Sequence, residues 1–112
     1  LDQFTRAVLG NPEVIAVNQD PLGQQADLLW REKKTLTEAW TRPLANGSHA
    51  VALFNRGFAP QEVEVTWKQL GLTGPQKVRD LWMRRDAGVL KDGYCAQIPA
   101  HGAKLVRVEE VD

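Results

Sequence analysis

The sequence contains one cysteine, Cys95, and no apolar run that approaches the length of a membrane-spanning helix. One cysteine cannot form a disulfide within the chain, so the fold must depend on a packed core. We expect Cys95 to behave as a small apolar residue in a buried strand. A bilayer-spanning helix requires roughly 20 consecutive apolar residues, and the sequence therefore predicts no membrane partner.

The chain also lacks an excess of charge of either sign. Its fourteen Lys and Arg residues balance fourteen Asp and Glu residues, and no basic run is present. Proteins that bind nucleic acid usually carry a clustered positive surface, so we expect no nucleic-acid partner. With 43% hydrophobic and 25% charged residues over 112 positions, the composition is typical of one soluble globular domain.

No set of residues in the sequence has the spacing of a catalytic or metal-binding site. Acid/base catalysis commonly uses converging carboxylates, but the acids here are scattered over a helix end, a strand and two turns: Asp20, Asp80, Asp86 and Asp92. The two histidines, His49 and His101, together with Cys95 lack the spacing of zinc ligands. We therefore predict no catalytic residue, no cofactor and no metal in this chain.

Helical spacing is confined to the first part of the chain. The apolar residues at its start recur every three, four or seven positions and would share one face of a helix: Leu1, Phe4 and Val8. Asn11-Pro12 has the signature of a helix N-terminus, followed by the apolar Val14 and Ile15. Asp20-Pro21 would end this second helix, since proline disfavours helical backbone in the residue before it.

The next twelve residues, 24–35, mix charge with Leu28, Leu29 and Trp30 and have no clear period, which suggests a linker with apolar side chains that dock onto a neighbour. From Thr35 onward, short β-type runs alternate with turn residues, and this pattern predicts a mainly β, antiparallel, Greek-key-like sandwich. The predicted strands are 36–44, 48–55, 62–67, 77–83, 94–98 and 103–109, with a further short strand near Val89.

Two predicted strands define the expected core. Val63, Val65 and Trp67 alternate with polar residues, which indicates a strand with one solvent-facing side, whereas residues 50–54 are apolar throughout and should lie centrally. Asn46-Gly47 between the first two strands predicts a type I′ hairpin turn. Asn46-Gly47-Ser48 is also an acceptor sequence for N-glycosylation, so Asn46 is a candidate glycosylation site.

The four tryptophans allow two interpretations. Exposed aromatic rings can stack on sugars, which would favour a carbohydrate-binding module, but tryptophans also dominate the cores of small β domains. The exposure of Trp40, Trp67 and Trp82 distinguishes the two. We favour packing in the core or at a domain interface.

Six stretches, in order along the chain, resemble one family. The first, NPEVIAVNQDPLG at 11–23, resembles the segment that closes the catalytic barrel of α-galactosidases and α-N-acetylgalactosaminidases, a family of retaining glycoside hydrolases. The similarity continues with WTRPL and NGSHAVALFNR at 40–44 and 46–56, TWKQLGL at 66–72, RDLW at 79–82 and IPAHGAKLVRV at 98–108.

This resemblance implies that residues 1–23 are the last helical segments of a (β/α)8 barrel, 24–35 a linker and 36–112 the C-terminal β-sandwich. In that family, the two catalytic aspartates lie on barrel strands upstream of this segment, so the chain is expected to be inactive alone. Its implied partner is the catalytic barrel of the same polypeptide. The candidate residues that dock onto the barrel are Leu1, Phe4, Val8, Val14, Ile15, Leu28, Leu29 and Trp30.

Two other functions stay open at this point. The chain could be an independent module that binds galactose-containing carbohydrate, or a domain that mediates subunit contacts. The family is often secreted or lysosomal, but this sequence carries no signal of its own, so no compartment is predicted.

Overall fold

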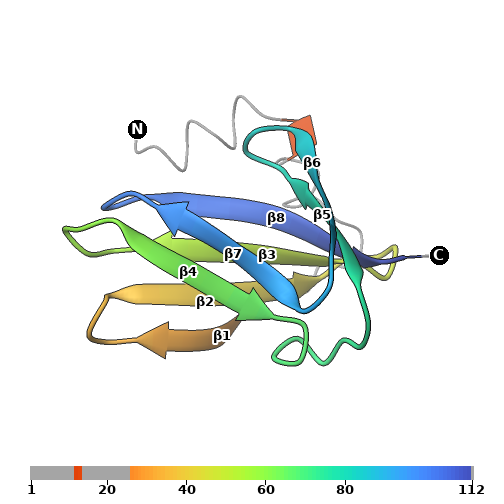
Figure 1. Ribbon diagram of the computed structural model, residues 1–112, viewed down its shortest axis with the longest axis horizontal. Coiled ribbons are helices and arrows are strands. Elements are labelled where there is room, and N and C mark those ends of the chain that lie inside the picture. The colour runs from red at the N-terminus through yellow and green to blue at the C-terminus, as the bar shows by residue number, and fades with distance from the viewer. Residues whose placement is uncertain (1–11, 14–25, 112) are drawn as a thin grey trace.

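The computed structural model describes residues 12–13 and 26–111 (Figure 1). Pro12 and Glu13 have helical backbone, and the rest of the two helices predicted within 1–23 lies outside the described residues. Among the helices of the described part, none is long and apolar enough to cross a membrane. The strands are β1 Asp27–Glu32, β2 Thr37–Pro43, β3 His49–Asn55, β4 Gln61–Thr66, β5 Gln76–Asp80, β6 Arg85–Leu90, β7 Gly93–Ile98 and β8 Ala103–Glu110.

These strands form two sheets that face each other. Six strands pair in the order β1-β2-β3-β8-β5-β6, and β4 pairs with β7 in a second sheet. Every pair is antiparallel. In Figure 1, β4 and β7 lie in front of β2, β3 and β8. The chain crosses between the sheets after β3, β4, β6 and β7, and the predicted antiparallel β-sandwich is confirmed.

The structure differs from the prediction within 24–35, where we expected a linker. Asp27–Glu32 of that range forms β1, an edge strand paired with β2. The register shifts between Leu28 and Trp30, so an extra residue interrupts the alternation of apolar and polar side chains. This bulge explains why the strand could not be recognised from its period. The strand expected near Val89 is β6.

The core lies between the inner faces of the two sheets. Val63 and Val65 of β4 are 1% and 0% exposed and Trp67 is 2% exposed, as the alternation predicted. The indole Nε1 of Trp67 donates to the carbonyl oxygen of Leu90 at 2.9 Å. β3 lies between β2 and β8, which confirms the central position expected for 50–54. The other core residues are Ala39, Val51, Leu53, Val78, Tyr94, Ile98, Val106 and Val108.

The hairpin between β2 and β3 is confirmed, but its predicted type I′ turn is wrong. Gly47 has φ of 87°, whereas Asn46 is not among the described residues with positive φ. The amide of Gly47 donates to the carbonyl of Leu44 at 3.1 Å, and the amide of Leu44 donates to the carbonyl of Ser48 at 2.9 Å. These contacts define a three-residue loop that needs a left-handed conformation only at its glycine.

Cys95 is exposed, contrary to our expectation of a buried residue. The core-facing residues of β7 are Tyr94 and Ile98, so residue 95 points to the other side. Although the residue as a whole is exposed, desolvation of its thiol, with the nearby carboxylates of Glu62 and Glu64, raises the pKa of Cys95 to about 11. Cys95 is therefore a poor nucleophile near neutral pH.

A buried carboxylate connects β1, β2 and the end of β3. Glu38 is 1% exposed. Its Oε2 lies 2.7 Å from Nη2 of Arg31, and its Oε1 accepts a hydrogen bond from Nε of Arg56. Burial alone would raise the pKa of Glu38, but the hydrogen bonds from Arg56 and Arg31 outweigh burial and lower it. The charge of Glu38 thus holds the edge strand to the sheet.

We expect Glu38→Gln to lower the free energy of unfolding at pH 7 by about 1–3 kcal/mol, because the substitution removes the buried carboxylate and leaves the partly solvated Arg31 and Arg56 without their anion. Glu64→Gln, at an exposed position, is the control. Urea unfolding measures both. Since the folded pKa of Glu38 lies below its ordinary 4.5, its contribution is complete above that pH and is lost as the pH falls through the folded pKa. A difference between wild type and Glu38→Gln that stays constant down to pH 3 would contradict this assignment.

Candidate interdomain interface

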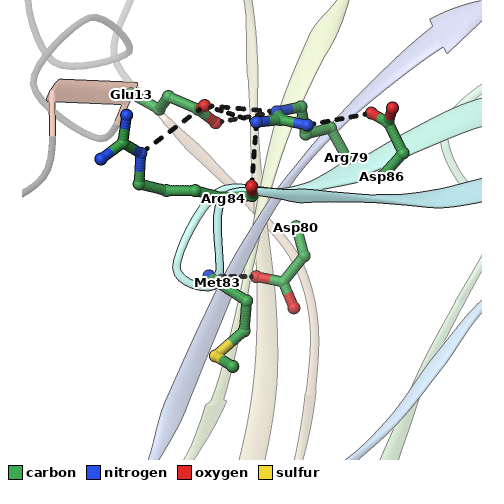
Figure 2. Close-up of polar contacts among 6 residues, drawn as sticks. All are labelled: Glu13, Arg79, Asp80, Met83, Arg84 and Asp86. Carbon is green, nitrogen blue, oxygen red and sulfur yellow. Dashed lines mark hydrogen bonds and ion pairs between the residues drawn. The ribbon is translucent and has the colours of Figure 1, made fainter.

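The helical residue Glu13 contacts the six-stranded sheet at β5, 66 positions away in sequence (Figure 2). Nη2 of Arg79 donates to Oε1 of Glu13 at 2.8 Å, and Nε of Arg79 donates to Oε2 at 3.0 Å. This two-pronged contact suits the planar guanidinium of arginine. The hydrogen bond from Arg79 lowers the pKa of Glu13, and Glu13 in turn raises the pKa of Arg79.

The β5–β6 turn holds Arg79 in place from the other side. Nη1 of Arg79 donates to Asp86 of β6 at 3.2 Å, and Nη2 donates to the carbonyl of Arg84 at 3.0 Å. Arg84 has a positive φ of 55°, and Figure 2 shows its carbonyl oxygen facing Arg79. Asp80 fixes the same turn, because its Oδ1 accepts a hydrogen bond from the amide of Met83 at 3.0 Å.

The buried side of that turn carries a second ion pair. Oδ2 of Asp80 lies 3.0 Å from Nζ of Lys104 on β8, and Asp80 is 5% exposed. The β5–β6 hairpin is thus fixed to β8 by charge as well as by backbone pairing. The β5–β6 hairpin therefore holds Arg79 in position to bind Glu13.

Arg79 belongs to a row of residues on the outer face of the six-stranded sheet, the face away from β4 and β7. Strand register places these residues side by side in the order Arg42, Ala50, Arg107, Arg79 and Asp86. We call this set the arginine row. Like charges directly opposite each other on neighbouring strands destabilise a sheet, and Glu13 offsets this effect where Arg107 and Arg79 meet.

Next to the arginine row runs an apolar row on the same face. It consists of Leu28, Trp40, Ala52 and Leu105, one from each of β1, β2, β3 and β8, in continuous register. Leu28 is 41% exposed, and the other three are half-buried. An apolar row beside a cationic row is a surface of the kind found at interfaces between domains.

The residues predicted to dock onto a barrel have different positions in this structure. Leu1, Phe4, Val8, Val14 and Ile15 lie outside the described residues. Leu28 lies in the apolar row of the outer face, whereas Leu29 and Trp30 pack against the sandwich's own core. Docking through these eight side chains stays a prediction. Sequence reasoning missed Glu13 and Arg79, because no local signal connects residues so far apart in the chain.

The tryptophans do not form an exposed binding platform. Trp67 is 2% exposed, and Trp40 and Trp82 are half-buried. This is the result expected for packing rather than for sugar stacking. Within the part of the chain that the structure describes, no cluster of His, Cys, Asp and Glu is arranged to hold a metal ion.

Asn46 lies exposed at the tip of the β2–β3 hairpin. Its Oδ1 accepts hydrogen bonds from the amide of Ser48 at 3.0 Å and from the hydroxyl of Ser48. These hydrogen bonds within the turn account for an asparagine at this position. Glycosylation of Asn46 stays a prediction.

We predict energetic coupling between Glu13 and Arg79. Glu13→Ala and Arg79→Ala should each destabilise the chain, and the double variant should lose clearly less stability than the sum of the two, because each single change already breaks the shared contact. Thermal unfolding of the four proteins measures the coupling. Asp86→Asn, which removes only the more exposed pair, should have a smaller effect than Glu13→Ala. Additive losses would show that the contact contributes nothing.

Comparison with known proteins gives consistent matches. Residues 34–108 match the family described as the α-galactosidase C-terminal β-sandwich domain. The chain is 38% identical over 110 residues to a probable α-galactosidase of Dictyostelium discoideum, covering 95% of this chain and 29% of that protein. It is also 38% identical over 109 residues to an α-galactosidase of Coffea arabica, covering 94% and 28%.

Solved structures agree with these matches. A β-L-arabinopyranosidase of Geobacillus stearothermophilus superimposes with a TM-score of 0.86 at 33% identity, covering all of this chain (100%) and 25% of that one. The α-galactosidase I of Mortierella vinacea superimposes with a TM-score of 0.83 at 28% identity, covering 96% and 29%. The chain spans less than a third of the length of the curated relatives it matches.

Proposed function

The chain belongs to the family of α-galactosidase C-terminal β-sandwich domains, and we propose that it is the non-catalytic C-terminal portion of an α-galactosidase that packs against the catalytic barrel of the same polypeptide. In this proposal, residues 1–23 end the barrel and the sandwich follows them. We call the polypeptide that contains both parts the longer polypeptide.

The contact between Glu13 and Arg79 is the observation that carries this proposal. Glu13 belongs to the segment assigned to the barrel, and Arg79 belongs to the sandwich. Three hydrogen bonds of 2.8, 3.0 and 3.3 Å join them. A sandwich that only followed the barrel on a flexible linker would not need such a contact. Its presence supports a fixed arrangement of the two parts.

The charges of the described residues support a non-catalytic role. A glycosidase commonly needs two facing carboxyl groups, one of which is kept protonated as the acid. The two buried carboxylates among the described residues, Glu38 and Asp80, are both paired with cations. Such pairing suits a structural role. The chemistry would therefore reside in the barrel.

The relatives suggest the substrate class of the longer polypeptide. The curated relatives are α-galactosidases, so we propose terminal α-linked galactose as the sugar that is released. One similar structure is a β-L-arabinopyranosidase. Assays should therefore include both an α-galactoside and a β-L-arabinopyranoside.

We expect the purified 112-residue chain to hydrolyse neither chromogenic substrate above background, whereas the longer polypeptide hydrolyses the α-galactoside. Deleting residues 26–112 from the longer polypeptide should lower its thermal stability and its soluble yield, because apolar surface that the sandwich covers becomes exposed. Hydrolysis by the chain alone would overturn the non-catalytic assignment. Unchanged stability and yield after the deletion would overturn the packing role.

A further inference from the structure

Two arginines on the outer face flank one small residue. Arg42 of β2 and Arg107 of β8 are both register partners of Ala50 on β3, so their side chains leave the sheet on the same face with Ala50 between them. Ala50 is 4% exposed. Alanine has no side chain long enough to separate its neighbours, and the two guanidinium groups can therefore reach toward a common point above it.

Both arginines carry a donor that is shielded from water and not used. Nε of Arg42 and Nε of Arg107 are buried, and neither has a hydrogen-bond partner among the described residues. A buried donor on a charged group that lacks an acceptor is costly. In native structures most buried donors have a partner in the protein, in ordered water or in a bound group.

The arginines of the arginine row also outnumber the acids that contact them. The arginine row carries three arginines, and Arg84 lies beside it with its Nε 3.9 Å from Glu13. The acids that contact this set in the described structure are Glu13 and Asp86, and both bind Arg79. Glu13 is also near enough to Arg107 for that charge to contribute to its lowered pKa, but no ion pair joins them. Arg42, at the other end of the row, has no described acid beside it.

We propose that Arg42 and Arg107 form a carboxylate-binding site, completed by an Asp or Glu side chain of the catalytic barrel when the barrel covers the outer face. This inference rests on the proposed function and adds which face docks and which chemistry it recognises. The site continues a contact that already exists, because Glu13 binds Arg79 in the same row. The adjacent apolar row, which includes Trp40 and Leu105, would be covered by the same partner.

The chemistry of the site favours a carboxylate from a docked protein. A guanidinium binds a carboxylate through two parallel N–H donors, and a neighbouring arginine can bind the second oxygen. Removing one partner from a buried ion pair leaves the other charge uncompensated and is strongly destabilising. In the described part of the isolated chain, Nε of Arg42 and Nε of Arg107 have no acceptor, whereas in this proposal the longer polypeptide supplies a carboxylate.

The isolated chain and the longer polypeptide should therefore respond to the same variant with opposite changes in melting temperature. In the isolated chain, the double variant R42M/R107M should raise the melting temperature by about 2–5 °C, because it removes two shielded donors that lack an acceptor. In the longer polypeptide, the same variant should lower the melting temperature by at least as much, because the barrel carboxylate is left without a partner. In the longer polypeptide, R42K/R107K should lower the melting temperature by a smaller amount, because lysine keeps the charge but not the paired donors.

Arg85→Met is the matched control, since Arg85 is an exposed arginine on β6. It should change neither melting temperature. Shifts of the same sign for R42M/R107M in both proteins, or no shift in the longer polypeptide, would overturn the carboxylate site. The proposed function is tested separately. It is contradicted if deletion of residues 26–112 leaves the longer polypeptide equally stable. It stands if that deletion destabilises the longer polypeptide while R42M/R107M does not destabilise it.

Discussion

The pairing of β3 with both β2 and β8 determines what each face of the large sheet can do. Val51 and Leu53 point into the core at 0% exposure, so the residues between and beside them must point outward. A slip of one residue in either pairing would exchange the two sets of side chains. The register that builds the core is therefore the same register that aligns the arginine row and the apolar row on the outer face.

Charge has a structural role throughout this domain. Glu38 fixes the edge strand, Asp80 fixes the β5–β6 hairpin through Lys104, and Glu13 joins the N-terminal segment to Arg79. Each of these acids has a cationic partner, whereas Nε of Arg42 and Nε of Arg107 have no hydrogen-bond partner among the described residues. The proposed carboxylate of the barrel would supply an acceptor to these two donors.

Much of the sandwich could be predicted from the sequence, because alternation and turn residues are local signals. The alternation at Val63, Val65 and Trp67 identified a core strand, and Asn46-Gly47 identified a hairpin. Local signals failed where one extra residue altered the pattern: the bulge in β1 concealed a strand, and the third loop residue changed the turn type. The outer face could not be predicted at all, because the row that includes Arg42, Arg107 and Arg79 exists only through long-range register.

The proposed docking covers the outer face of the six-stranded sheet in the longer polypeptide. Hydroxyl-radical footprinting of the isolated chain and of the longer polypeptide measures this directly, residue by residue. We predict that Trp40 and Leu105 become protected in the longer polypeptide, while Phe58, which is 87% exposed on the β3–β4 loop, reacts equally in both. Equal reactivity of Trp40 and Leu105 in the two proteins would contradict the account.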